Sequence, residues 1–251
     1  MSYIFIVIVI VFNIYGENPI QYNLIEGMPN IYISRMSEKI GHTWTNGSVW
    51  EKHLIQKFYA LLKKHDDFFV MFDLGAQTGC FSLLAKYFPH SEWYAFEPII
   101  EAVEALKENL VLNNISNVRV YNNAVTDYVG SITLKMPAMN EWGLSTIGVN
   151  PLRFDTFTER EVSCITLDDF VDKNNIKKVH FMKLDTEGSE LSILQGAVRM
   201  LQRDHPTMII EYNATNMRQC GFTKKNLEDF LIHMGYQWQL ISSEDILCIP
   251  R

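Results

Sequence analysis

The 251-residue sequence lacks any cluster of basic residues. Its 22 lysines and arginines stand against 29 acidic residues, which gives a formal net charge of -7, and lysines occur together only as the pairs 63–64, 177–178 and 224–225. Non-specific binding to nucleic acid depends on clustered Lys and Arg side chains that contact phosphates. The composition therefore predicts no nucleic-acid partner.

The sequence also has only four cysteines and only one long apolar run. The four cysteines are far apart in the chain and show neither metal-ligand spacing nor a disulfide framework, so we expect reduced thiols. Residues 3–11 form an apolar, β-branched run that is too short to span a bilayer. No Lys or Arg precedes Arg35, so a signal peptide would lack its basic segment. We predict a buried strand and a cytoplasmic protein, with a membrane anchor or secretory segment as the alternative.

Nearly half of the residues are apolar, which is enough for one sizeable core. We expect an N-terminal extension, residues 1–64, packed on a core domain, residues 65–251. Residues 17–47 are rich in Asn, Pro and Gly, which favours loops and short strands. Residues 50–64 carry apolar side chains at helical spacing and predict an amphipathic helix.

From residue 69 onward, short apolar runs alternate with helical segments, which is typical of parallel βαβ units in an α/β fold. The predicted parallel strands are residues 69–74, 93–96, 118–124, 179–184 and 208–212. The predicted helices are residues 79–88, 99–113, 189–203 and 224–234. Residues 236–241 and 246–249 should form a C-terminal antiparallel hairpin. An insertion, residues 130–172, should contain strands 131–135 and 162–165 joined by a loop with Trp142.

The turn after the first predicted strand reads Asp73-Leu-Gly-Ala-Gln-Thr-Gly79. Ligands of open α/β sheets bind beyond the carboxyl ends of the strands, and glycines let the backbone approach them closely. A nicotinamide site usually has three glycines in G-x-G-x-x-G, which this turn lacks. The carboxylate of Asp73 would repel a pyrophosphate but suits the ammonium and sulfonium of S-adenosylmethionine. An ordinary strand-to-helix turn is the alternative interpretation. The predicted cofactor contacts here are Asp73, Gly75, Ala76, Thr78 and Gly79.

Two further strand ends carry side chains suited to a nucleoside. Glu97 ends the second strand, where an acid can accept hydrogen bonds from both ribose hydroxyls, and Pro98 stops that strand. Asn123 and Ala124 close the third strand, where they could face an adenine edge. We therefore add Glu97, Pro98, Asn123 and Ala124 to the predicted cofactor site.

The fourth strand ends in Lys183-Leu-Asp-Thr-Glu-Gly-Ser-Glu190. Glu190 would begin the next helix, where an acid serves as a structural partner of the helix N-terminus. Asp185 and Glu187 are the predicted catalytic residues, because an acceptor hydroxyl needs a base to take its proton. Glu211 and Asn213 could join Asp185 around a hard cation such as magnesium. Carboxylates at strand ends need no ion to explain them, so no metal ligand is predicted.

These motifs, together with Phe96-Glu97-Pro98 and Asn123-Ala124-Val125, resemble the FkbM-type methyltransferases over residues 69–212. The Asp-x-Glu-Gly-x-Glu element is the most family-specific piece, and Gln77 stands where the family often has Asn. The resemblance implies a Rossmann-like class I methyltransferase sheet with helices on both faces. It also implies S-adenosylmethionine-dependent O-methylation of a small-molecule or glycan hydroxyl, often of a sugar.

Two other functions remain open at this stage. The chain could be a catalytically silent binding subunit that keeps the cofactor fold, although its intact acidic turn argues against this. It could also be a nicotinamide-dependent oxidoreductase, which the glycine spacing disfavours. The sequence does not indicate the acceptor or the oligomeric state.

Overall fold

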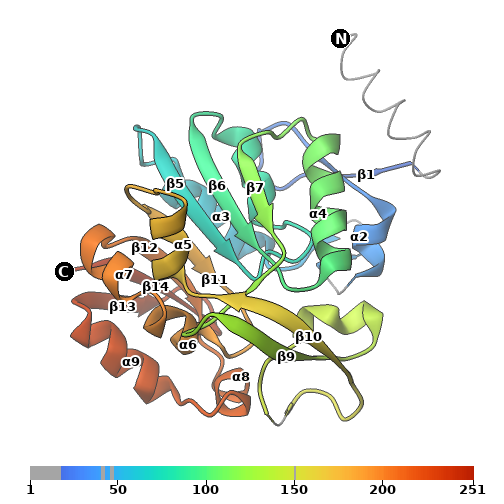
Figure 1. Ribbon diagram of the computed structural model, residues 1–251. Coiled ribbons are helices and arrows are strands. Elements are labelled where there is room, and N and C mark those ends of the chain that lie inside the picture. The colour runs from blue at the N-terminus through green and yellow to red at the C-terminus, as the bar shows by residue number, and fades with distance from the viewer. Residues whose placement is uncertain (1–17, 41–42, 46–47, 150) are drawn as a thin grey trace.

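A seven-stranded sheet forms the centre of the protein. The computed structural model describes residues 18–40, 43–45, 48–149 and 151–251, so the predicted strand at residues 3–11 lies outside the described residues. The strand order is β13-β14-β12-β11-β5-β6-β7 (Figure 1). The sheet contains β5 (Phe69–Leu74), β6 (Ser91–Phe96), β7 (Val118–Tyr121), β11 (Phe181–Leu184), β12 (Thr207–Glu211), β13 (Tyr236–Leu240) and β14 (Asp245–Pro250).

The pairing confirms the prediction of five parallel strands followed by an antiparallel hairpin. β7, β6, β5, β11 and β12 pair in parallel, whereas β14 is antiparallel to both β12 and β13. The last strand in the chain is therefore inserted between β12 and the edge strand β13. The fold is an α/β sheet whose parallel carboxyl ends share one edge.

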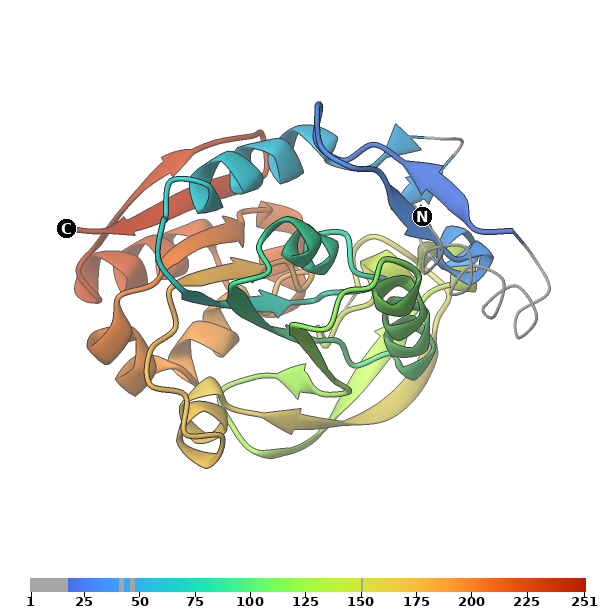
Figure 2. The ribbon, with the colours of Figure 1, turned by 90° about the horizontal axis from the view of Figure 1, so that it is seen from above.

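Side chains of the central strands alternate between two cores. In β5, Phe69 and Met71 pack in one hydrophobic cluster, whereas Val70, Phe72 and Leu74 pack in the other. This two-residue period places apolar side chains on both faces, as expected for a parallel sheet covered by helices on each side. Figure 2 shows α3 (Lys52–Leu62) on one side of the sheet and α5 (Leu167–Lys173) on the other.

The helices partly match the predicted ranges. Three match within a few residues: α3, α4 (Ile100–Leu112) and α9 (Lys224–His233). The predicted helix 79–88 is a shorter 3-10 helix, η1 (Ser82–Tyr87). α2 (Arg35–Lys39), α5 and α8 (Ala214–Gln219) had not been predicted.

The predicted continuous helix 189–203 is wrong, since it divides into α6 (Glu190–Gln195) and α7 (Val198–Asp204). The chain breaks at Gly196, where an added Cβ would lie 2.2 Å from the Thr126 carbonyl oxygen. The Asp168 carboxylate then accepts hydrogen bonds from the backbone N–H groups of Arg199 and Met200, in the first turn of α7. These contacts come from distant segments, so helical periodicity could not reveal the break.

The predicted strand 118–124 also ends early. β7 stops at Tyr121, and the Asn122 side-chain amide donates to the carbonyl oxygens of Glu97 and Pro98. After this interruption β8 (Ala124–Val125) joins a second sheet, with the order β8-β10-β9. The interruption directs the chain out of the main sheet and into the insertion.

The insertion forms a long hairpin of β9 (Gly130–Met136) and β10 (Thr158–Ile165). It lies beyond the carboxyl ends of β5, β6 and β7 (Figure 1). Its tip contains a second 3-10 helix, η2 (Met139–Leu144). The hairpin thus brings its loop toward the edge where parallel α/β sheets bind ligands.

The N-terminal segment packs on the same core. It contains β1 (Ile20–Tyr22), β2 (Ile31–Ile33), β3 (Trp44–Thr45) and β4 (Ser48–Val49). The side chains of Asn109 in α4 and of Asn113 just after it accept hydrogen bonds from the backbone N–H groups of Ser34 and Tyr32, respectively. Within the described ranges, we find no helix with both the length and the apolar character to cross a membrane.

Candidate active site

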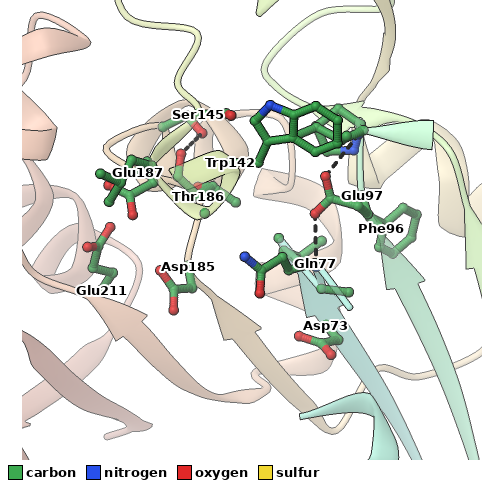
Figure 3. A pocket seen from close by; sticks show the side chains of 18 of the residues that line it. Asp73, Gln77, Phe96, Glu97, Trp142, Ser145, Asp185, Thr186, Glu187 and Glu211 are labelled. Atoms are coloured by element: carbon green, nitrogen blue, oxygen red, sulfur yellow. Dashed lines mark hydrogen bonds between the residues drawn. The ribbon is translucent and has the colours of Figure 1, made fainter. Parts of the chain in front are cut away.

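A cavity of about 330 Å³ opens at the carboxyl ends of the parallel strands (Figure 3). Its walls come from the turns that follow β5, β6, β11 and β12, from the β9–β10 loop, and from Trp50 and Glu51 ahead of α3. Most of the predicted site residues line this cavity: Asp73, Gly75, Ala76, Glu97, Pro98, Asn123, Ala124, Asp185 and Glu187. Thr78 and Gly79 are not part of its lining.

The glycine turn after β5 is held against two neighbouring strands. Gly75 has φ +80°, and the backbone N–H groups of Gly75 and Ala76 both donate to the Phe96 carbonyl oxygen at 3.0 Å. A Cβ at Gly75 would lie 1.9 Å from the Asp185 carbonyl oxygen, so only glycine fits. The turn therefore has direct backbone contact with both the Glu97 strand and the acidic turn.

Gln77 and Thr78, later in this turn, have different surroundings. Gln77 adopts a left-handed φ of +47°, a conformation that Asn tolerates better than most residues. The Thr78 hydroxyl is fully buried and accepts a hydrogen bond from the Trp44 indole at 2.8 Å. The Thr78 side chain thus joins the N-terminal segment to the turn.

Asp73 is buried beneath the glycine turn. Its carboxylate accepts a hydrogen bond of 2.6 Å from the Ser82 hydroxyl. Burial raises the pKa of Asp73 to about 6, while the Ser82 hydrogen bond and the Lys183 charge act in the opposite direction. At neutral pH the group is therefore mainly ionised and can face a cationic ligand.

Glu97 connects two turns through its carboxylate. One oxygen accepts from the Gln77 N–H and the other from the Ile99 N–H, each at 2.9 Å (Figure 3). Burial raises the pKa of Glu97 to about 7, although both backbone hydrogen bonds lower it. Among the described residues, each oxygen accepts from one donor, which leaves lone pairs for a ligand such as a ribose diol. Nearby, Asn123 donates to the Ser163 hydroxyl at 2.8 Å.

The acidic turn after β11 is shaped by positive backbone angles. Glu187 has φ +54° and Gly188 has φ +104°, and a Cβ on Gly188 would lie 1.9 Å from the Asn216 carbonyl oxygen. The buried Glu190 carboxylate accepts from the Thr186 and Gly188 N–H groups and from the Thr186 hydroxyl. Glu190 begins α6, as expected, but its side chain closes the turn before the helix rather than capping the helix itself.

The carboxylates of Asp185 and Glu187 face the cavity with different cationic partners. Glu187 pairs with Arg153 at 3.0 Å, and Asp185 pairs with Lys183 at 3.1 Å. Burial, with the Asp185 charge, raises the pKa of Glu187 to about 8 against the opposing effect of Arg153. Asp185 is the more exposed of the two, with a side-chain exposure of 33% against 12%. The Asp185 carboxylate is thus better placed to meet an entering substrate.

Lys183 is a component of the site that the sequence analysis did not assign. Its side chain is 1% exposed, lies 3.6 Å from the Asp245 carboxylate and stacks over the Phe81 ring. Burial lowers the pKa of Lys183, but the surrounding carboxylates outweigh that effect and hold the pKa above its usual value. The sequence did contain a signal for Lys183, because it is a lysine within an apolar strand that ends in an acidic turn.

Three other lining residues, Glu51, Arg153 and Glu244, were not predicted. They lie at the start of the predicted helix 50–64, in the loop of the insertion and in the turn of the predicted hairpin, where no local pattern indicates a contact with the cavity. Trp142 and Ser145 of the insertion also line the cavity. The Thr146 hydroxyl instead donates to the Glu187 carbonyl oxygen at 3.0 Å. The insertion is thereby joined to the acidic turn.

The sheet order and the cavity at its carboxyl edge define a Rossmann-like methyltransferase fold. Residues 73–238 match the family model described as the methyltransferase FkbM domain. The chain therefore belongs to the FkbM methyltransferase family. This assignment covers the glycine turn, the Glu97 strand end and the acidic turn.

Individual relatives are more distant. The chain is 29% identical over 158 residues to Methyltransferase 1 of Beauveria bassiana, covering 57% of this chain and 63% of that protein. A crystal structure of methyltransferase FkbM from Methylobacillus flagellatus is 20% identical, with a TM-score of 0.46, over 71% of this chain and 42% of that one. A putative caffeoyl-CoA O-methyltransferase from Staphylococcus aureus is 10% identical, with a TM-score of 0.50, over 81% and 86% of the two chains. The last likeness shows the fold alone.

Proposed function

We propose that this protein is an S-adenosylmethionine-dependent O-methyltransferase that modifies a hydroxyl group of a sugar or glycan. The main observation is that one cavity joins two chemically distinct ends. At one end Asp73 and Glu97 offer acceptors for an ammonium and a ribose, and at the other Asp185 and Glu187 offer carboxylates to an acceptor. The family assignment supports methyl transfer, and the acidic end supports oxygen as the acceptor atom.

The residues around the glycine turn fit the proposed cofactor. Gly75 and Ala76 would bring their backbone close to it, the ionised Asp73 would face its cationic amino acid part, and Glu97 would bind its ribose. Pro98, Asn123 and Ala124 would form the nucleoside side of the cavity. Bound S-adenosylmethionine would supply an electrophilic methyl group on a sulfonium.

The acidic turn would serve the acceptor. Asp185 would accept the proton of the hydroxyl as its oxygen bonds to the methyl carbon and the carbon–sulfur bond breaks. The buried Lys183 ammonium fixes the position of the Asp185 carboxylate at 3.1 Å. Glu187, whose carboxylate pairs with Arg153 at 3.0 Å, is the alternative residue to assist this deprotonation. Trp142 offers an aromatic face of the kind that stacks on sugar rings.

Calorimetric titration with S-adenosylmethionine tests the cofactor assignment. Asp73→Ala should weaken binding at least tenfold, because it removes the buried charge beside the turn. Asp67→Ala is the matched control, since Asp67 is an exposed carboxylate just before β5. Equal affinities for wild type and Asp73→Ala would refute the assignment. A parallel titration with a nicotinamide dinucleotide tests the oxidoreductase alternative, which requires that this cofactor binds instead of S-adenosylmethionine.

Incubation of a glycan and small-molecule library with isotopically labelled cofactor, followed by mass spectrometry, tests the reaction. Asp185→Asn should reduce turnover by about 100-fold or more, as expected for loss of a general base, while Asp67→Asn should not. Cofactor binding without methyl transfer to any acceptor would favour a silent binding subunit. Unchanged turnover in Asp185→Asn would exclude Asp185 as the base.

A further inference from the structure

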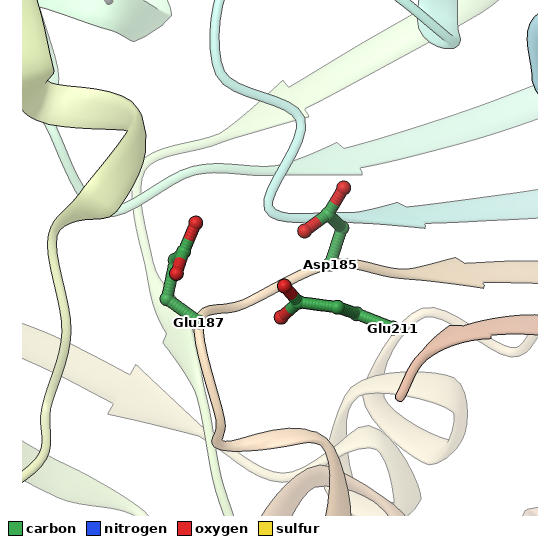
Figure 4. A group of neighbouring side chains, drawn as sticks. All are labelled: Asp185, Glu187 and Glu211. Atoms are coloured by element: carbon green, nitrogen blue, oxygen red, sulfur yellow. The ribbon is translucent and has the colours of Figure 1, made fainter. Parts of the chain in front are cut away.

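Three carboxylates converge at the acceptor end of the cavity: Asp185, Glu187 and Glu211 (Figure 4). One oxygen from each lies within 4.8 Å of the others. Asp185 and Glu187 belong to the turn after β11, and Glu211 ends β12. Oxygens that surround one divalent cation at about 2.0 to 2.6 Å must themselves lie within about 5 Å of one another, so the spacing fits a single ion.

Glu211 supplies an independent indication of a ligand. Its residue is 9% exposed, and its Oε2 atom is buried with no hydrogen-bond partner among the described residues. The other oxygen accepts a hydrogen bond of 2.6 Å from the Asn216 side-chain amide. The carboxylate points toward the other two acids (Figure 4). An unpartnered buried carboxylate oxygen is costly, and a cation between the three acids would remove that cost.

The three carboxylates share one pattern of partners. Arg153 holds one oxygen of Glu187, Lys183 holds one oxygen of Asp185, and the Asn216 amide holds one oxygen of Glu211. Within the part of the chain that the structure describes, the second oxygen of each acid has no protein donor. Nitrogen donors that fix one oxygen and leave the other free are typical of the outer shell of a metal site.

Charge also favours a cation here. Glu51 and Glu244 line the same cavity. Arg153 and Lys183 are the cationic side chains among the described lining residues, and both are already paired. The acidic end thus carries more carboxylates than its own cations neutralise.

We propose that Asp185, Glu187 and Glu211 bind one hard divalent cation of the magnesium or manganese class. All three ligands are carboxylates, without His or Cys, which favours such ions over zinc. The set differs from the one considered from sequence, because Asn213 caps α8 through the N–H groups of Thr215 and Asn216. The remaining coordination positions face the cavity, where acceptor oxygens would enter. That last role rests on the proposed function, whereas cation binding does not.

Electron paramagnetic resonance of Mn²⁺ measures binding without cofactor or acceptor, because the free ion gives a signal that is lost on binding. Protein stripped with EDTA and dialysed should take up one Mn²⁺ per chain, and Mg²⁺ should displace it. Glu211→Gln should weaken binding at least tenfold while it can retain the hydrogen bond from Asn216. Glu141→Gln is the matched control, since Glu141 lines the cavity outside the acidic group.

Thermal unfolding distinguishes lost binding from lost structure. Mn²⁺ should raise the melting temperature of wild type and of Glu141→Gln but not that of Glu211→Gln, which should fold as well as metal-free wild type. No Mn²⁺ uptake by wild type, or equal uptake by Glu211→Gln, would overturn the site. If methyl transfer is intact in protein that takes up no Mn²⁺, this inference fails alone. If Mn²⁺ binds but no acceptor is methylated, the proposed function fails and the cation site stands.

Discussion

Replacing Glu97 with Gln should change how stability depends on pH. The pKa of Glu97 is raised by burial from an ordinary value of 4.5 to about 7, so the folded protein holds this proton more tightly than the unfolded chain. That difference corresponds to about 3 kcal/mol of unfolding free energy. The contribution is fully present below about pH 4.5 and is lost as the pH rises through about 7.

The substitution also has an effect that does not depend on pH. In wild type the two carboxylate oxygens accept from the N–H groups of Gln77 and Ile99. The amide NH₂ of glutamine cannot accept, so one buried N–H would lose its partner at a cost of about 1 to 3 kcal/mol. The informative quantity is therefore the change with pH in the stability difference between the two proteins.

Urea unfolding of cofactor-free protein at several pH values between about 5 and 8 measures this quantity. The advantage of wild type over Glu97→Gln should shrink by about 2 to 3 kcal/mol across that range. Glu159→Gln, which changes an exposed carboxylate on β10, should run parallel to wild type. A constant difference between wild type and Glu97→Gln would show that burial does not raise this pKa, and the reasoning would be wrong.

Three further substitutions test the packing around the cavity by urea unfolding. Gly75→Ala would place a Cβ 1.9 Å from the Asp185 carbonyl oxygen and should lower the free energy of unfolding by more than about 3 kcal/mol. The control Gly221→Ala, at a glycine with a similar φ but open space around it, should lower it by only about 1 to 2 kcal/mol. Equal losses of stability in the two variants would contradict the clash. Lys183→Met would leave the carboxylates of Asp245 and Asp185 without the cation that they share. It should lower the free energy of unfolding by about 3 to 5 kcal/mol. An unchanged midpoint of urea unfolding would mean that the ion pairs contribute little to stability. Thr166→Ala removes the hydroxyl that caps α5 through the Asp169 N–H and should cost about 1 kcal/mol, whereas Thr166→Ser should retain most of the stability if the cap is responsible.

The sequence predicted the parts of the site that depend on strand ends. Parallel strands end at one edge, so Asp73, Glu97 and Asp185 had to lie close together once their strands were recognised. The glycine at position 75 was recognised for the same reason. Which residues contact the cofactor stays a prediction, although most of the predicted residues line one cavity.

The residues that were missed depend on contacts between distant segments. Arg153 pairs with Glu187 from a loop without regular periodicity, and Glu51 reaches the cavity from a left-handed turn. The break at Gly196 needs the carbonyl oxygen of Thr126, some 70 residues earlier in the chain. By contrast, α5 had a local signal, because Thr166 followed three residues later by Asp169 matches a capping pattern.

The β9–β10 hairpin supplies one wall of the cavity from outside the main sheet. Its seven paired positions and its pairing with β8 fix its base, while the tip contributes Arg153, which pairs with Glu187 at the acceptor end, and Trp142, which lines the cavity above Glu97 (Figure 3). The hydrogen bonds that the Asp73 and Glu97 carboxylates accept come from outside that tip, from Ser82, Gln77 and Ile99. Exchange of residues 137–157 between related proteins should therefore transfer acceptor preference while donor use is kept, which makes this hairpin the natural place for specificity to diverge and to be engineered.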